Sequence, residues 1–106
     1  MPDLKKTRRQ MLEELAAQQP SNAFTRYGLA MECMNCGDPA AADTHFRALL
    51  QDHSGYVPAY LMYAQFLARE QRAAEARQVL ASGIAAASQK GDSHARSEME
   101  ALLSEL

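Results

Sequence analysis

Residues 58–84 read PAYLMYAQFLAREQRAAEARQVLASGI, and strong helix formers fill most of this stretch. Its apolar and small side chains recur three or four residues apart, which places them on one face of a helix. The first such set is Tyr60, Tyr63, Ala64 and Leu67, and the second is Ala76, Leu80 and Gly83. We therefore expect two amphipathic helices, joined by a short turn near residues 70–72 and packed face to face.

The rest of the chain has the same character. Of its 106 residues, 47% are hydrophobic and 23% are charged, which is typical of a globular domain rather than a disordered chain. Residues that favour strands, such as Val, Ile and Thr, are scarce. These proportions predict one all-α domain over residues 1–106. We expect about six helices, over residues 3–19, 22–35, 39–53, 58–70, 73–89 and 93–105.

Turn and capping residues mark the ends of these helices. Gly37 and Gly91 can each end a helix in the left-handed conformation, and an aspartate that can cap the next helix follows each of them, Asp38 and Asp92. Asn22 has the same capping role after Pro20. For the first helix we predict Asp3 as the cap. Its apolar face is predicted to comprise Leu4, Met11, Leu12, Leu15 and Ala16.

Two segments of the chain repeat each other. Phe24-x2-Tyr27-Gly28-x2-Met31 has the pattern of Tyr60-x2-Tyr63-Ala64-x2-Leu67. Further on, Ala42-x3-Phe46-x2-Leu49 has the pattern of Ala76-x3-Leu80-x2-Gly83. The first pair of patterns is offset by two residues more than the second pair. This difference implies a two-residue insertion near Cys36 and Gly37. We expect Gly28 and Ala64, and likewise Ala42 and Ala76, to be equivalent points of close helix approach. We assign the apolar stripe of residues 22–35 to the core, namely Phe24, Tyr27, Met31 and Met34. Gly83, inside a predicted helix, should mark a close helix–helix contact.

This pattern resembles the tetratricopeptide repeat, whose period is about 34 residues. The resemblance implies a right-handed array of antiparallel helical hairpins, an α–α superhelix. It covers repeat 1 (21–55) and repeat 2 (57–90), flanked by an N-terminal helix (3–19) and a C-terminal capping helix (92–105). The chain departs from the family pattern in having no Trp and in placing Ser54 and Ser88 where a repeat normally ends in Pro.

The resemblance also implies a function: binding of a partner's peptide or helix in the concave groove formed by the first helix of each repeat. Carried over by position, the groove residues of the first copy are Asn22, Thr25, Leu29, Glu32 and Cys33, and those of the second are Leu61, Gln65, Ala68 and Arg69. Some members clamp a terminal carboxylate with Lys and Asn, but at the matching positions this chain has Thr25, Leu29, Leu61, Met62 and Gln65, so we expect no such clamp. We expect no cofactor.

Two alternatives remain open at this point. Repeat arrays usually need three or more units, so the open end of this short array could pair with a second copy to form a homo-oligomer. The spacing Cys33-x-x-Cys36 could instead mark a thiol or metal site. Because the pair falls at the end of a helix, where the dipole disfavours a thiolate, ordinary reduced thiols are the favoured interpretation.

Several classes of function are disfavoured. No phosphate-binding loop and no recognisable Ser-His-Asp set occurs, so we expect a protein that is not an enzyme. The net charge of −2 argues against binding of nucleic acid. No apolar run approaches the length needed to span a bilayer, and the N-terminus has no secretory signal, so we expect a cytoplasmic protein without a membrane partner.

Overall fold

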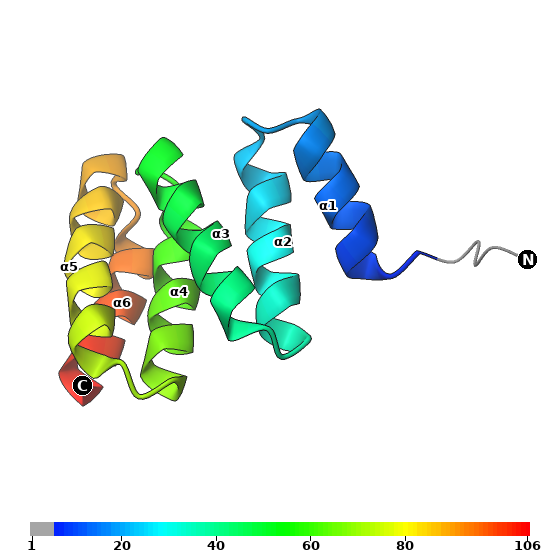
Figure 1. The fold of residues 1–106 in the computed structure, drawn as a ribbon. Coiled ribbons are helices and arrows are strands. Elements are labelled where there is room, and N and C mark those ends of the chain that lie inside the picture. Colours follow the sequence, from blue (N-terminus) through cyan, green and yellow to red (C-terminus); the bar gives the residue numbers. More distant parts are fainter. Residues whose placement is uncertain (1–5) are drawn as a thin grey trace, which may run out of the picture. The chain divides into compact units, whose positions relative to one another are not determined.

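The computed structural model describes residues 6–106, and these residues form six α-helices joined by short turns (Figure 1). The helices are α1 (Arg8–Gln18), α2 (Ala23–Asn35), α3 (Pro39–Asp52), α4 (Val57–Arg69), α5 (Ala73–Lys90) and α6 (Ser93–Glu105). No strand occurs within the described residues. The predicted all-α array of about six helices is confirmed. None of the helices is both long enough and apolar enough to cross a membrane within residues 6–106.

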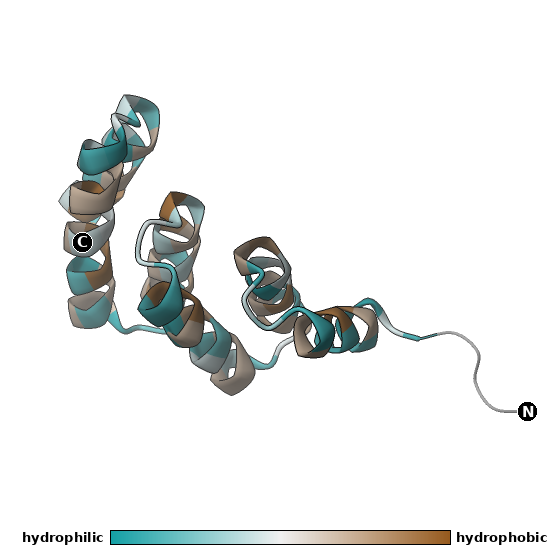
Figure 2. Cartoon of the chain, turned by 90° about the horizontal axis from the view of Figure 1, so that it is seen from above, coloured by the Kyte–Doolittle hydropathy of each residue, from teal (hydrophilic) through white to brown (hydrophobic). Residues whose placement is uncertain are grey.

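The chain divides into two compact units, the first ending at Asp52 and the second beginning at His53. In the first unit, α2 packs against both α1 and α3 (Figure 1). In the second unit, α4 and α5 form a hairpin, and α6 packs against both of them. Figure 2 shows that the helices of each unit carry both hydrophobic and hydrophilic residues. The single domain over residues 1–106 and its repeat boundaries remain predictions.

The predicted capping residues begin α2, α3 and α6. The Asn22 side chain accepts a hydrogen bond from the backbone N–H of Thr25 at 3.1 Å. Asp92 accepts one from the N–H of Ala95 at 3.1 Å, and Asp38 accepts one from the N–H of Ala41 at 3.2 Å. Each cap satisfies a donor that the first turn of a helix leaves unpaired. The bounds of these helices therefore lie within one residue of those predicted.

The start of α1 differs from the prediction. The predicted helix begins near Asp3, whereas α1 begins at Arg8 with Thr7 as its N-cap. Thr7 and Gln10 form a capping box, in which each side chain accepts a hydrogen bond from the other residue's backbone N–H. This reciprocal pair fixes the helix start. The predicted cap Asp3 and the predicted face residue Leu4 lie outside the described residues.

The turns that follow α2, α4 and α5 share one conformation. Gly37, Gln71 and Gly91 have φ of 78°, 63° and 70°, the left-handed region that favours glycine. After each of them, the next backbone N–H reaches back to the carbonyl of the last helical turn, at 2.8–2.9 Å. This is the Schellman arrangement of a helix end. Since Gly37 and Gln71 are as far apart in the chain as Ala42 and Ala76, the two hairpin turns are equivalent without the predicted insertion.

Fully buried residues repeat at the same spacing as the turns. Ala42 and Phe46 of α3 correspond to Ala76 and Leu80 of α5, and all four are inaccessible to solvent, as predicted. In the first helix of each hairpin, Ala30 and Cys33 of α2 correspond to Ala64 and Leu67 of α4, and these four are also fully buried. One spacing therefore relates both helices and the turn of the first hairpin to those of the second.

This spacing corrects the predicted alignment of α2. Phe24 is 73% exposed, although its predicted equivalent Tyr60 is buried. Gly28 is only partly buried, so Ala30 rather than Gly28 is the counterpart of Ala64. The physical reason is the position of α2 between α1 and α3, where close approach favours small side chains. The prediction that the bulkier apolar stripe of α2 faces the core is wrong, because it took the larger side chains to be the buried ones.

The predicted apolar face of α1 is only half correct. Leu12 and Ala16 are partly buried, but Met11 is 48% exposed and Leu15 is 43% exposed. No residue of α1 is buried. Because α1 packs against α2 and against no other helix of the described chain, only one edge of its apolar stripe is covered.

Candidate functional site

The predicted groove residues of the first copy lie along one face of α2, but most of them already have structural partners. Asn22 caps the helix through the N–H of Thr25. Glu32 forms an ion pair with Arg8 of α1, with 3.2 Å between Oε1 and Nε. Leu29 is 2% exposed, so its side chain offers almost no surface. Contact of these residues with a partner remains a prediction. Because Leu29 is buried, it is not accessible to a partner in this structure.

The predicted residues of the second copy are better placed for contact. Leu61, Gln65 and Arg69 follow each other at intervals of four residues and therefore share a face of α4. We call them the α4 stripe. Gln65 and Arg69 are exposed and Leu61 is half-buried, so all three retain accessible surface. Arg69 has no ion-pair partner in the part of the chain that the structure describes, so its cation is available.

The repeat spacing identifies the corresponding surface of α2. It places Tyr27 at the position of Leu61 and Met31 at that of Gln65, while Met34 corresponds to Ala68. With Phe24 one turn earlier, these residues form the α2 stripe: Phe24, Tyr27, Met31 and Met34. Sequence reasoning assigned this stripe to the core and missed it as a surface. The signal that could have found it was the offset between Ala42 and Ala76, applied to the whole repeat.

The α2 stripe has the composition of an interaction surface. Phe24 is exposed, and the other three members are half-buried, so each retains accessible area. Their spacing of three, four and three residues follows the length of the helix, and none of them is charged. Aromatic residues and Met are enriched where proteins bind one another. The flexible thioethers of Met31 and Met34 can adapt to differently shaped apolar partners.

The two cysteines lie at the end of α2 beside a cation from α1. Cys33 is fully buried, and burial raises the pKa of its thiol, which disfavours the reactive thiolate. Cys36 is exposed, and its Sγ lies 3.7 Å from Nη1 of Arg9. Residues 6–106 contain no group of three or more His, Cys, Asp or Glu side chains placed to hold a metal ion.

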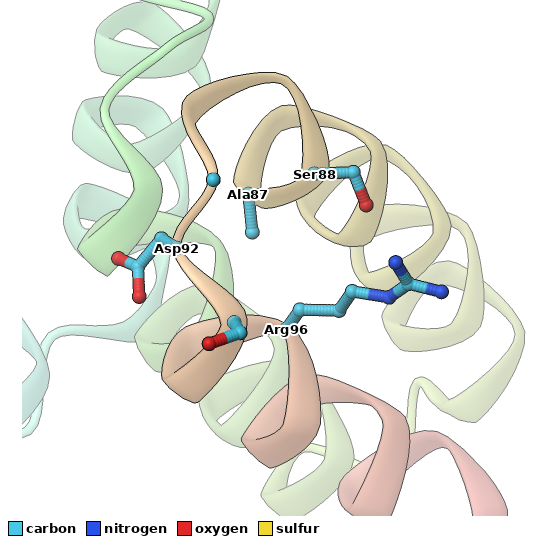
Figure 3. Close-up of a pocket in the computed structure, with 6 residues that line it drawn as sticks. Ala87, Ser88, Asp92 and Arg96 are labelled. Atoms are coloured by element: carbon cyan, nitrogen blue, oxygen red, sulfur yellow. The ribbon is translucent and has the colours of Figure 1, made fainter.

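A small pocket of about 110 Å³ lies at the turn between α5 and α6 (Figure 3). Its lining includes Ala87, Ser88, Asp92 and Arg96. The Asp92 carboxylate and the Arg96 guanidinium point in different directions, and both are engaged: Asp92 caps α6, and Arg96 pairs with Glu100 at 3.2 Å. Ligand pockets usually measure about 300–1,000 Å³, so this hollow is too small for most organic ligands.

Comparison with known proteins agrees with the repeat geometry. The family model described as tetratricopeptide repeat matches residues 36–105. A TPR repeat-containing protein of Pseudomonas aeruginosa is 28% identical over 95 residues, which cover 90% of each chain.

Two solved structures show the same architecture. The solution structure of a Bordetella parapertussis protein has a TM-score of 0.80 at 29% identity, covering 95% of this chain and 88% of that one. The crystal structure of a tetratricopeptide repeat domain protein from Salinibacter ruber has a TM-score of 0.73 at 27% identity, covering 79% of this chain and 93% of that one. The two hairpins repeat at one constant spacing, and the family model matches most of the length of the chain. The chain therefore belongs to the tetratricopeptide repeat family.

Proposed function

We propose that this protein binds partner proteins through the accessible faces of the first helices of its repeats, α2 in the first unit and α4 in the second. Tetratricopeptide repeats generally serve as protein–protein interaction modules, and their stacked hairpins present extended binding surfaces. The observation that carries the proposal is the α2 stripe, which presents Phe24, Tyr27 and Met31 at helical spacing without a charged residue among them.

The stripes would bind by presenting side chains on a preformed support. Ala30 and Cys33 of α2 are fully buried and fix the rotation of the helix. Because the stripe residues lie on a packed helix rather than a loop, little backbone order would be lost on binding. Phe24 supplies the largest exposed apolar surface, so we assign it the role of the main anchor.

The two stripes favour different chemistry in a partner. The α2 stripe suits apolar side chains, such as one face of an amphipathic helix. The α4 stripe ends in Arg69, whose free guanidinium suits a carboxylate or a backbone carbonyl. The initially predicted residues Asn22, Thr25 and Glu32 remain candidates at the margin of the surface.

The test begins with capture of partners from the native lysate by the wild-type chain, followed by affinity measurements with one purified partner. Phe24→Ala should weaken binding at least about tenfold, as expected for an anchor residue. The matched control is Phe46→Leu, which changes a fully buried aromatic and should leave affinity unchanged while lowering stability. Full affinity after combined substitution of Phe24, Met31 and Gln65 would contradict the proposed surface.

Self-association is the second candidate, because Met11 and Leu15 leave apolar surface on α1 uncovered. Homo-oligomers through this open end of the array would bury it. Sedimentation at increasing concentration tests the idea, and a chain that stays monomeric at the highest concentration would exclude it. A thiol or metal function at Cys33 and Cys36 has less support, since burial keeps Cys33 protonated and inaccessible.

A further inference from the structure

Helix α1 is the least anchored helix of the described chain. None of its own residues is fully buried, and α2 is its only helical neighbour there (Figure 1). At the contact with α2, Leu12 lies over Gly28, with its Cδ2 3.5 Å from where a Cβ on Gly28 would be. Since apolar burial is the main source of packing energy, α1 is held less firmly than the helices that contribute fully buried residues.

Charge complementarity also contributes to the docking of α1. Two consecutive cations of α1 meet two acids of the hairpin formed by α2 and α3. Arg8 pairs with Glu32 at 3.2 Å, and Arg9 pairs with Asp38 at 2.8 Å. Because the acids lie at the end of α2 and at the start of α3, they orient as well as attract an incoming helix. We call this face, comprising Gly28, Glu32 and Asp38, the α1-docking face.

Helix α1 carries its own stabilising contacts, which it keeps when it leaves the face. Thr7 and Gln10 close the capping box at its start. Two ion pairs lie within the segment, Lys6 with Glu14 at 2.7 Å and Arg9 with Glu13 at 3.1 Å. Only residues 19–22 connect α1 to α2, and Pro20 restricts the conformations of this connection. The helix and its hinge have the features of an exchangeable element.

We propose that the α1-docking face is an exchangeable helix-binding site, which accepts α1 of a second copy of this chain as well as its own. The second copy is the occupant that these contacts support, because its α1 has the arginines and the leucine that the face already binds. Reciprocal exchange would form a closed dimer with two identical interfaces. The proposal gives the self-association alternative a defined surface and is independent of partner binding by the α2 stripe.

A charge-reversal complementation experiment tests this directly. One variant carries Arg8→Glu and Arg9→Gln, so that its helix no longer matches its own face. The other carries Glu32→Arg and Asp38→Asn, where Asn keeps the cap of α3. Each alone opposes docking within the chain. In a mixed dimer, one interface is entirely wild type. The other reverses the ion pair between positions 8 and 32 and places two neutral amides at positions 9 and 38, so neither interface opposes docking.

We expect the equimolar mixture to form a 1:1 species of twice the monomer mass in light scattering, with hydrogen exchange of α1 slowed at least tenfold relative to either variant alone. A single chain carrying all four substitutions is the control, and it should regain protection of α1 without a partner. If that control regains protection while the mixture stays monomeric, exchange is excluded. If the control does not regain protection, charge does not direct docking and the proposal also fails.

Discussion

Gly83 of α5 lies so close to Tyr60 of α4 that a Cβ at position 83 would be 2.6 Å from the Cβ of Tyr60. The same atom would be 2.6 Å from Sδ of Met99 on α6. Three helices of the second unit therefore meet at one glycine. This close contact was predicted from the sequence, in which Gly83 interrupts an otherwise favourable helix, and it is confirmed.

Gly83→Ala should therefore destabilise the protein, although Ala is the better helix former by about 1 kcal/mol. Met99 is flexible, but the Cβ of Tyr60 is fixed to its backbone, so the added methyl has to displace α4 from α5. Overpacking of this kind costs about 1–3 kcal/mol. Urea denaturation measures the change. Ser82→Ala, on the exposed neighbouring position of α5, is the control and should alter stability by no more than about 0.5 kcal/mol.

The corrected alignment of α2 makes a second prediction, at Gly28 and Ala30. A Cβ on Gly28 would meet Leu12 at 3.5 Å, an ordinary contact, so Gly28→Ala should stabilise the helix by about 0.5–1 kcal/mol. Ala30 is fully buried, and Ala30→Leu should destabilise by about 1–3 kcal/mol. The melting temperatures of the two variants should move in opposite directions. Destabilisation by Gly28→Ala would restore the original alignment, in which Gly28 is the point of close approach.

The bounds of most helices could be predicted because the chain signals them locally. A cap such as Asp92 and a stop such as Gly91 act through neighbouring backbone groups, and these interactions can be read from the sequence. The start of α1 depends on two reciprocal hydrogen bonds between Thr7 and Gln10. This capping box was not recognised in the sequence, where Asp3 was predicted as the cap.

The face of α2 could not be predicted from periodicity, because two sets of apolar residues share its spacing. Phe24 and Met31 form one set, and Ala30 and Cys33 form the other. Hydrophobicity favours the larger side chains for the core, but a helix that packs on two sides buries the smaller ones. The candidate surface on α4 stays a prediction, and the repeat spacing moves its counterpart on α2 by two residues from the predicted positions. Only the neighbours of α2 decide which set is inside.

The turn after α4 provides a third prediction. Gln71 has a φ of 63°, whereas the equivalent residue of the first hairpin is Gly37. A residue with a Cβ is strained in this conformation by about 1 kcal/mol, so Gln71→Gly should raise the free energy of unfolding by about that amount. The reciprocal change Gly37→Ala should lower it by a similar amount. Equal stabilities of wild type and Gln71→Gly would show that the turn does not hold the residue in the left-handed region.

The last prediction concerns acid. Burial and the nearby charges of Arg26 and Arg9 lower the pKa of His45 below its ordinary value. In the unfolded chain His45 has the ordinary value of about 6.5, so near and below this pH the unfolded state binds more protons than the folded state. The stabilising effect of neutral His45 is therefore complete above about pH 7 and is lost as the pH falls through 6.5 toward the folded value.

Stability of the wild type should accordingly decrease from pH 7 to pH 5, and His45→Gln should reduce this slope because it removes the proton uptake on unfolding. Urea denaturation at several pH values measures both. Asp38 and Glu13, whose carboxylates oppose the effect of the arginines on His45, are present in both proteins and cancel in the comparison. The control is Ser97→Ala at an exposed position of α6, which changes no titratable group and should keep the wild-type slope. An unchanged slope in His45→Gln would assign the acid sensitivity to other groups.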